Sequence, residues 1–238
     1  MTDAAAPLLA ITVGVHGSAS TWVFNVAREV LAEAVGGAVH GCHLLQPDDL
    51  ARDRALGARH IVAKTHGWPD LAASARAWGA PAIVSVRDPR DAIVSVIQRF
   101  GEPFDRALGG IAQDCRAALA CAEAGFPVLR YEDRFFEQPA SVRLIATHLG
   151  LGVSDAAAAR IFDAYTTEAV RTLAAGVADL PAERVAGDAR FRFDRLTQIT
   201  QSHIGDARTG KWRDLLPPDQ QMAVGMLLRP FLARFGYA

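Results

Sequence analysis

The chain alternates short, continuous apolar runs with longer segments whose apolar residues recur at helical spacing. Four runs have the length and composition of strands buried on both faces of a parallel sheet; they are residues 8–15, 60–65, 81–86 and 127–132. Helical spacing predicts helices near residues 21–34, 71–78, 89–98, 105–124 and 142–149, and a last helix near 219–228 that Pro230 interrupts. Strands that alternate with helices predict an α/β fold of three layers, with a mostly parallel central sheet and helices on both faces.

The last third of the chain breaks this pattern. Residues 176–210 are rich in Arg and Asp and have little clean periodicity. A loop of that length is uncommon inside a compact domain unless it is a lid or a binding element. Since no linker composition separates a second domain, we expect one domain over residues 1–238, with a lid or substrate-binding segment at about 176–210.

Composition narrows the class of protein. Half of the 238 residues are hydrophobic, 21% are charged, and the formal net charge is −1. A full core is therefore possible, and nothing in the overall charge favours nucleic acid as a partner. The apolar run after MTDAAAP is too short for a membrane span and lacks signal-peptide flanks, so we expect a cytoplasmic protein. The three cysteines, without metal-ligand spacing, indicate reduced thiols, with Cys115 on an apolar stripe.

The first chemical motif is HGSASTW, residues 16–22, where the first strand runs into a helix. Its small residues allow the backbone to approach an anion closely. The N–H groups of the helix start, with the hydroxyls of Ser18, Ser20 and Thr21, can donate to a 5′-phosphate. An ordinary turn capped by serine fits the loop about equally well. A conventional P-loop is disfavoured, because the Gly-Lys-Ser/Thr that carries the lysine and the magnesium-binding hydroxyl is missing.

The second motif is VSVRDPRDAIVSV, residues 84–96. Asp88 as N-cap and Pro89 at the first helical position predict a helix start directly after a buried strand. Arg87 then stands at the tip of the strand and Ser95 two turns into the helix, where the pair can clamp a second anion. Alternatively, Arg87 pairs with Asp91 as a structural ion pair.

The third motif is AKTH, residues 63–66. It places two basic side chains, Lys64 and His66, at the end of a strand. His66 is a candidate general base, and Lys64 can stabilise charge that develops during group transfer. A lone histidine is more often structural, and this is the default interpretation of His16, His40, His43, His60 and His148.

Together these motifs resemble the family of sulfotransferases that use 3′-phosphoadenosine 5′-phosphosulfate (PAPS). Residues 16–22 occupy the place of the family's P-K-S-G-T-T-W loop, and Lys64-Thr65-His66 the place of its K-T-H. The arginine and serine eight residues apart match its 3′-phosphate motif. Tyr131 lies in a Y-E-D sequence, and residues 210–213 match a late G-x-W-[KR]. The five matches occur in family order over nearly the whole chain.

The resemblance implies a P-loop-like fold and sulfuryl transfer from PAPS to a hydroxyl or amine, without a metal. Trp22 would stack on the adenine. The 3′-phosphate would be held by Arg87, Ser95 and Lys211. His66 would be the general base, assisted by Lys64. The residues assigned to the nucleotide are Gly17, Ser18, Ala19, Ser20, Thr21, Trp22, Arg87, Ser95, Tyr131, Gly210, Lys211 and Trp212.

The acceptor and the oligomeric state stay open. The acceptor is a small molecule, a glycan or a lipid, selected by residues 67–69, 100–104 and 176–210. No nucleic acid and no membrane span are expected.

Two departures from the family keep other interpretations open. Gly17 stands where the family has its loop lysine, and Ala19 where it has a glycine. Either Lys64, Lys211 or His16 compensates for the missing loop lysine, or the enzyme is slow, or the donor site is altered. A catalytically silent protein that binds the product 3′-phosphoadenosine 5′-phosphate (PAP) is one alternative. A magnesium-dependent nucleotide phosphotransferase is the other.

Overall fold

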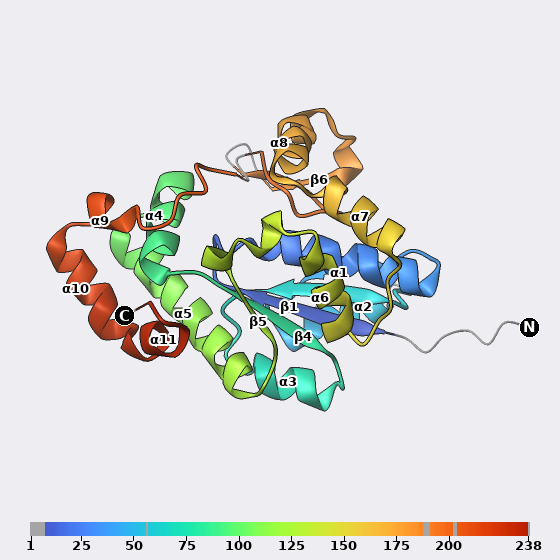
Figure 1. Ribbon diagram of the computed structural model, residues 1–238, viewed down its shortest axis with the longest axis horizontal. Coiled ribbons are helices and arrows are strands. Elements are labelled where there is room, and N and C mark those ends of the chain that lie inside the picture. Colours follow the sequence, from blue (N-terminus) through green and yellow to red (C-terminus); the bar gives the residue numbers. More distant parts are fainter. Residues whose placement is uncertain (1–7, 56, 188–190, 202–203, 238) are drawn as a thin grey trace, which may run out of the picture.

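The computed structural model describes residues 8–55, 57–187, 191–201 and 204–237. Five parallel strands form the central sheet in the order β2-β3-β1-β4-β5 (Figure 1). They are β1 (Leu9–Gly14), β2 (His40–His43), β3 (Ile61–Thr65), β4 (Ala82–Val86) and β5 (Val128–Arg130). Strand β1, the first in sequence, is central, so its C-terminal end has a neighbouring strand end on each side.

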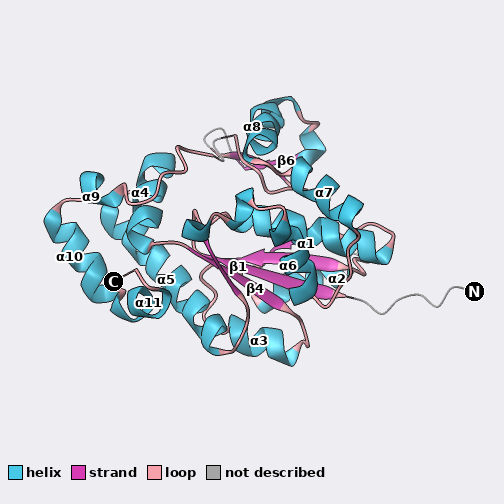
Figure 2. Ribbon diagram, viewed as in Figure 1, coloured by secondary structure: helices cyan, strands magenta, loops and turns pink. Residues whose placement is uncertain are grey.

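Helices cover both faces of this sheet (Figure 2). Helices α1 (Ser20–Val35) and α6 (Ala140–His148) pack together on one side, while α4 (Pro89–Phe100) and α5 (Phe104–Glu123) pack together, with α5 against β1 and β4. The other helices are α2 (Pro47–Ala55), α3 (Leu71–Ala77), α7 (Asp155–Ala164), α8 (Thr167–Ala175), α9 (Trp212–Leu215), α10 (Pro218–Leu227) and α11 (Arg229–Phe235).

The continuous apolar runs explain why the sheet is buried on both faces. Successive side chains of a strand point to opposite faces. In β1, Leu9, Ile11 and Val13 enter the core that contains α5 residues, whereas Ala10 enters the core that contains α1 residues. Every residue of β1 is therefore buried, as a strand between two helical layers requires.

The structure confirms the α/β class, the mostly parallel sheet and the four strands that apolar runs predict. The edge strand β2 is missing from the sequence prediction because it reads His-Gly-Cys-His and is mostly solvent-accessible. Helices α7 and α8 are also missing from it, although Ser154 and Thr166 cap them with side-chain oxygens. Asp88 caps α4 as predicted, by accepting from the Arg90 N–H.

The described residues of the late segment 176–210 contain more regular structure than its composition predicts. It contains short 3₁₀ helices at Gly176–Asp179 and Ala182–Arg184, and an antiparallel pair, β6 (Val185–Gly187) with β7 (Arg192–Asp194). Positions 188–190 and 202–203 of the expected lid lie outside the described residues, as do residues 1–7 and 238 of the expected domain.

Pro230 acts differently from the prediction. It stands in the first turn of α11, where its missing N–H costs no hydrogen bond, so it begins a new helix directly after α10. Helices α10 and α11 both pack on α5. In the part of the chain that the structure describes, none of the helices combines the length and the apolar character needed to cross a membrane.

Candidate active site

A cavity of about 1200 Å³ lies at the C-terminal ends of the strands, where open α/β sheets bind ligands. Residues of β2 and residues that follow β1, β3, β4 and β5 reach it, together with the segment around β6 and β7. The chain contains only two lysines, Lys64 and Lys211, and both line this cavity. The other predicted site residues that line it are Gly17, Ala19, Ser20, Thr21, Trp22, His66, Arg87, Ser95 and Tyr131.

The loop between β1 and α1 is folded tightly against its neighbours. A Cβ on Gly14 would lie 2.3 Å from the Cβ of Ser20 and 2.7 Å from Ser85 Oγ, so only glycine fits at this turn. Gly17 and Ala19 both adopt left-handed backbone, with φ of 77° and 60°. This conformation brings the start of α1, with its unpaired N–H groups, to the edge of the cavity.

Ser18, by contrast, does not face the cavity. Its side chain is fully buried, and its Oγ lies 2.8 Å from Ser85 Oγ. The hydroxyls that reach the cavity from this loop belong to Ser20 and Thr21. The structure thus gives Ser18 a partner inside the protein, where the sequence predicts a phosphate contact.

Lys64 projects from the end of β3 to the first turn of α1. It is buried, and its Nζ donates to Thr21 Oγ1 at 2.7 Å. Burial, and to a smaller extent the nearby Arg99, lowers the pKa of Lys64 from 10.5 to about 7, while Asp114 acts in the opposite direction. Within the described ranges of the chain, the hydrogen-bond partner of this buried ammonium is a neutral hydroxyl, which favours binding of an anion.

His66 has its tautomer set by the protein. Its Nδ1 lies 2.5 Å from the Gly14 carbonyl oxygen, which can only accept, so Nδ1 carries the proton. Nε2 then carries the lone pair, and the His66 side chain lines the cavity. Burial lowers the pKa of His66 well below 6.5, and His16, Lys64 and His43 lower it further, so the neutral, basic form persists at neutral pH.

Two histidines that the sequence treats as structural surround this base. The His16 ring stacks on His66 with centroids 3.8 Å apart, and the His43 ring lies 5.7 Å away. Asp114 holds His16 in place, because its buried Oδ2 accepts from the backbone N–H at 2.9 Å and from Nδ1 at 2.5 Å. Sequence spacing could not reveal this cluster, since Asp114 comes from α5 on the other side of the sheet.

Arg87 is held at the mouth of the loop. Its Nη1 donates to the Gly17 carbonyl at 3.0 Å and its Nη2 to the Arg208 carbonyl at 2.9 Å. The guanidinium lies 4.2 Å from the centroid of the Tyr131 ring, which orients it by a cation–π contact. Its Nε is buried without a hydrogen-bond partner.

The alternative in which Arg87 pairs with Asp91 is wrong. Asp91 instead accepts from the backbone N–H groups of Gly210 at 2.6 Å and Trp212 at 3.0 Å. Gly210 and Trp212 therefore anchor the late loop to α4 and lie outside the cavity lining. Lys211, between them, enters the cavity, and its Nζ bonds to Gln98 Oε1 at 3.1 Å and to Asp206 Oδ1 at 3.2 Å.

Trp22 lies on the cavity wall with one edge fixed. Its Nε1 donates to the Tyr165 carbonyl at 2.9 Å, and its ring packs edge-on against Phe135 at 5.7 Å. An indole fixed in this way offers a rigid apolar surface on which a base can stack.

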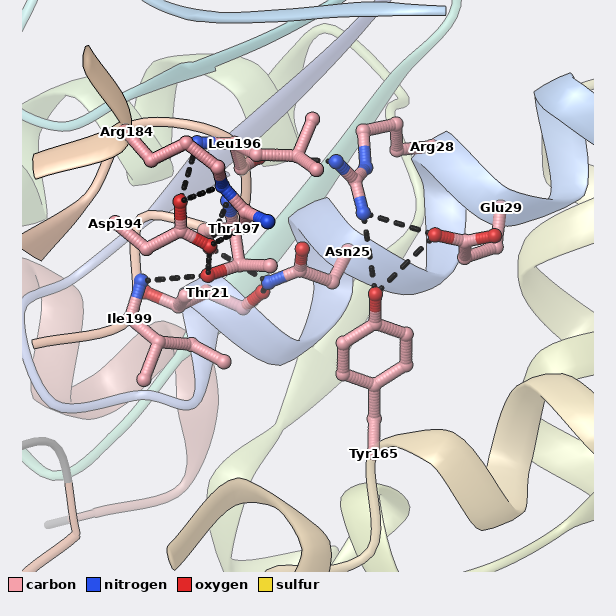
Figure 3. A network of polar contacts seen from close by, with 10 residues as sticks. All are labelled: Thr21, Asn25, Arg28, Glu29, Tyr165, Arg184, Asp194, Leu196, Thr197 and Ile199. Carbon is pink, nitrogen blue, oxygen red and sulfur yellow. Dashed lines mark hydrogen bonds and ion pairs between the residues drawn. The ribbon is translucent and has the colours of Figure 1, made fainter. Parts of the chain in front are cut away.

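A network of buried polar contacts joins α1 to the segment after β7 (Figure 3). Asn25 Nδ2 donates at 2.8 Å to the Thr21 carbonyl and at 2.8 Å to the Thr197 carbonyl. Arg28 donates to the Leu196 carbonyl at 3.0 Å and to the Tyr165 hydroxyl at 3.1 Å. The wall formed by the late segment is therefore bonded directly to the helix that begins at the candidate phosphate loop.

Asp194, at the end of β7, holds the late segment together through hydrogen bonds. Burial raises its pKa, but the bonds from Arg184 and Thr197 outweigh burial and hold the pKa below 3.8. Its oxygens also accept from the backbone N–H groups of Leu196 and Thr197. Asn25, Arg28 and Asp194 have no distinctive sequence pattern, and only the fold shows that they act together.

Two groups of described residues bring metal-ligand atoms within 4.8 Å of one another: His16, His66 and Asp114, and His40, Cys42 and Asp53. In the first group, hydrogen bonds to Asp114 and Gly14 already use Nδ1 of both histidines. In the second group, burial raises the pKa of the Cys42 thiol, which disfavours the thiolate that a metal requires.

The fold matches solved structures over nearly the whole chain. Mouse sulfotransferase SULT7A1 in complex with PAP has a TM-score of 0.66 and 15% identity, over 96% of this chain and 86% of that one. Retinol dehydratase in complex with retinol and PAP has a TM-score of 0.58 and 14% identity, over 96% of this chain and 82% of that one. Its complex with androsterone and PAP has a TM-score of 0.59 and 15% identity, over 96% and 81%.

These likenesses confirm the fold that the family resemblance predicts. The chain has the α/β fold of the sulfotransferase structures, with its cavity at the C-terminal ends of the parallel strands. No protein-family model matches the sequence. No curated protein matches it either.

Proposed function

We propose that the protein transfers the sulfuryl group of PAPS to a hydroxyl or amine of an acceptor, with His66 as general base. The observation that carries this proposal is the geometry of His66. The Gly14 carbonyl oxygen, 2.5 Å from Nδ1, fixes the proton there and leaves Nε2 as the basic atom of a side chain that lines the same cavity as Lys64 and the start of α1. A base, a cation and a helix N-terminus then surround one place where a transferring group can lie.

The role of each group follows from this placement. His66 Nε2 accepts the acceptor's proton as the acceptor oxygen bonds to sulfur and the bond from sulfur to the 5′-phosphate oxygen breaks. PAP leaves with that electron pair. Lys64 and the first N–H groups of α1 stabilise the negative charge on the transferring and leaving oxygens. Positioning and charge stabilisation supply the catalysis, as in phosphoryl transfer.

The nucleotide would lie along the loop and across the sheet. Its 5′ end would bind Ser20, Thr21 and the start of α1, and its adenine the surface of Trp22. Arg87, Ser95 and Lys211 lie on the cavity wall and would hold the 3′-phosphate. PAP is bound in the SULT7A1 and retinol dehydratase structures, which supports PAPS as donor here.

The acceptor would occupy the rest of the cavity. Retinol and androsterone in the retinol dehydratase structures show that a related fold admits small apolar molecules. Phe100, Phe191 and Phe193 line the corresponding cavity here, and Phe100 and Phe191 meet edge-on at 5.4 Å. This lining supports a small apolar or aromatic acceptor that carries the nucleophile.

The test is the variant His66→Ala with PAPS and a panel of phenols, alcohols and amines. We expect turnover, followed as PAP release, to be abolished, while calorimetry shows unchanged affinity for PAP. His148→Ala is the matched control, because His148 ends α6 away from the cavity lining. Equal loss of turnover and PAP affinity in His66→Ala would contradict the role of base.

The silent PAP-binding protein is the second candidate, and Gly17 favours it. The φ of Gly17 is 77°, a backbone conformation that disfavours any side chain at the place of the family's loop lysine. Wild-type protein that binds PAP tightly and releases none from PAPS with any acceptor would support this candidate. Magnesium-dependent binding of ATP in preference to PAP would instead support the phosphotransferase.

A further inference from the structure

Helix α4 passes the loop at the residue where the family's lysine is missing. A Cβ on Gly17 would lie 3.6 Å from Ser95 Oγ and 3.4 Å from Arg87 Nη1. Arg99 follows Ser95 by four residues on the same helix, so the two share one face, about one turn apart. Both side chains line the cavity.

The guanidinium of Arg99 carries a charge that nothing in the described part of the chain neutralises. Its Nη2 donates to Thr200 Oγ1, and its Cζ lies 5.0 Å from the Phe100 ring centroid and 5.9 Å from that of Phe191. Its Nε is buried without a hydrogen-bond partner. Burial lowers the pKa of Arg99 to about 10. A desolvated cation without a carboxylate partner is unfavourable unless an anion binds there.

Lys64 is the second cation of the same cavity that forms no ion pair with a carboxylate among the described residues. Its Nζ donates a hydrogen bond to a neutral group, the Thr21 hydroxyl. After burial, Arg99 is the largest cause of its lowered pKa, so the guanidinium of Arg99 lies close enough to disfavour the charge on Lys64. Two cations that repel each other across a cavity, next to a helix N-terminus, form a site for an oxyanion.

Building on the proposed function, we propose that Arg99 binds the 5′-phosphosulfate of PAPS and supplies the positive charge that Gly17 omits. The charge reaches the donor from the side wall of the cavity, one helical turn beyond Ser95, and not from the loop. Thr200 and the ring of Phe191 hold the guanidinium in place from the late segment. Arg99 is thereby a donor-binding residue that the sequence motifs do not contain.

The test compares two nucleotides that differ only at the 5′ end. Calorimetry measures the affinity of wild type, Arg99→Gln and Arg99→Lys for PAP and for adenosine 3′-phosphate, which lacks the 5′-phosphate. We expect Arg99→Gln to weaken PAP about 10- to 100-fold, as loss of a charged hydrogen bond does. Arg99→Lys keeps the charge and should weaken PAP less. Neither variant should change the affinity for adenosine 3′-phosphate, which also shows that the variants are folded.

Arg195→Gln is the matched control, because Arg195 also lines the cavity but comes from the late segment. It should leave PAP affinity unchanged. The inference is overturned if Arg195→Gln lowers the affinity for PAP as much as Arg99→Gln does. It is also overturned if Arg99→Gln lowers the affinity for both nucleotides equally, or if it leaves the affinity for PAP unaltered. The last result, with a selective loss of turnover, would assign Arg99 to the acceptor. Failure of wild type to bind either nucleotide would instead contradict the proposed function.

Discussion

Replacing Lys64 by methionine tests whether the buried charge of Lys64 lowers the stability of the folded protein while it favours anion binding. Lys64→Met removes the charge and keeps an unbranched apolar side chain of similar length. The pKa of Lys64 falls from 10.5 to about 7 in the folded protein, mainly through burial. Since one pKa unit corresponds to about 1.4 kcal/mol, the buried charge costs on the order of 5 kcal/mol below pH 7.

The lost bond to Thr21 offsets part of this gain, by about 1 kcal/mol. We therefore expect Lys64→Met to be more stable than wild type by roughly 3–4 kcal/mol at pH 6. Between pH 7 and 10.5 the unfolded chain binds the proton that the folded protein has released. Wild-type stability thus rises with pH in this window, and the advantage of the variant declines.

The assay is urea denaturation of both proteins at intervals from pH 6 to pH 10, without ligand. Lys211→Met is the control, because the Lys211 ammonium already bonds to Gln98 and Asp206 and its loss should bring no gain. A Lys64→Met variant that is no more stable than wild type at pH 6, or whose advantage is the same at pH 6 and pH 10, refutes the reasoning. The stabilised variant should also bind PAP more weakly.

Three further changes test other parts of the structure. Gly17→Ala should lower the free energy of unfolding by about 1–2 kcal/mol in urea denaturation, because φ is 77° there, although the nearest atom, Arg87 Nη1, leaves room at 3.4 Å. His66→Gln should be more stable than wild type below pH 6.5, because the lowered pKa of His66 makes wild type lose stability as pH falls through that range; a pH-independent difference would contradict this. Asp194→Asn should cost about 2 kcal/mol and open the late segment to limited proteolysis, because its bond to Arg184 is weakened; an unchanged digestion pattern would contradict this.

The sequence predicts those helices and strands whose own residues carry the pattern that specifies them. The apolar run 8–15 belongs to a strand between two cores, and Asp88 with Pro89 starts a helix in any surroundings. Strand β2 lacks such a signal, because pairing with β3 and not its own His-Gly-Cys-His sequence makes it a strand.

The same distinction holds for the candidate site. Lys64 and His66 are predictable, since they end a strand that is easily identified. Asp114 and Arg99 are not, because the contact of Asp114 with His16 and the place of Arg99 in the cavity lining depend on how the fold packs α5 and α4. Ser18 and Asp91 show the converse. The sequence predicts a phosphate contact for Ser18 and, as an alternative, an ion pair with Arg87 for Asp91, yet the structure uses Ser18 to join the loop to β4 and Asp91 to anchor the late loop.

The scarcity of lysine has a practical consequence for chemical labelling. Apart from the α-amino group, the only primary amines of the chain are those of Lys64 and Lys211, and both lie in the cavity, while all other basic side chains except histidine are arginines. At pH 7 about half of the Lys64 amines are unprotonated and nucleophilic, given a pKa of about 7. Apart from the α-amino group, an aldehyde or activated ester should therefore modify only lysines of the cavity. Protection by bound PAP would then measure occupancy directly, before any acceptor is known.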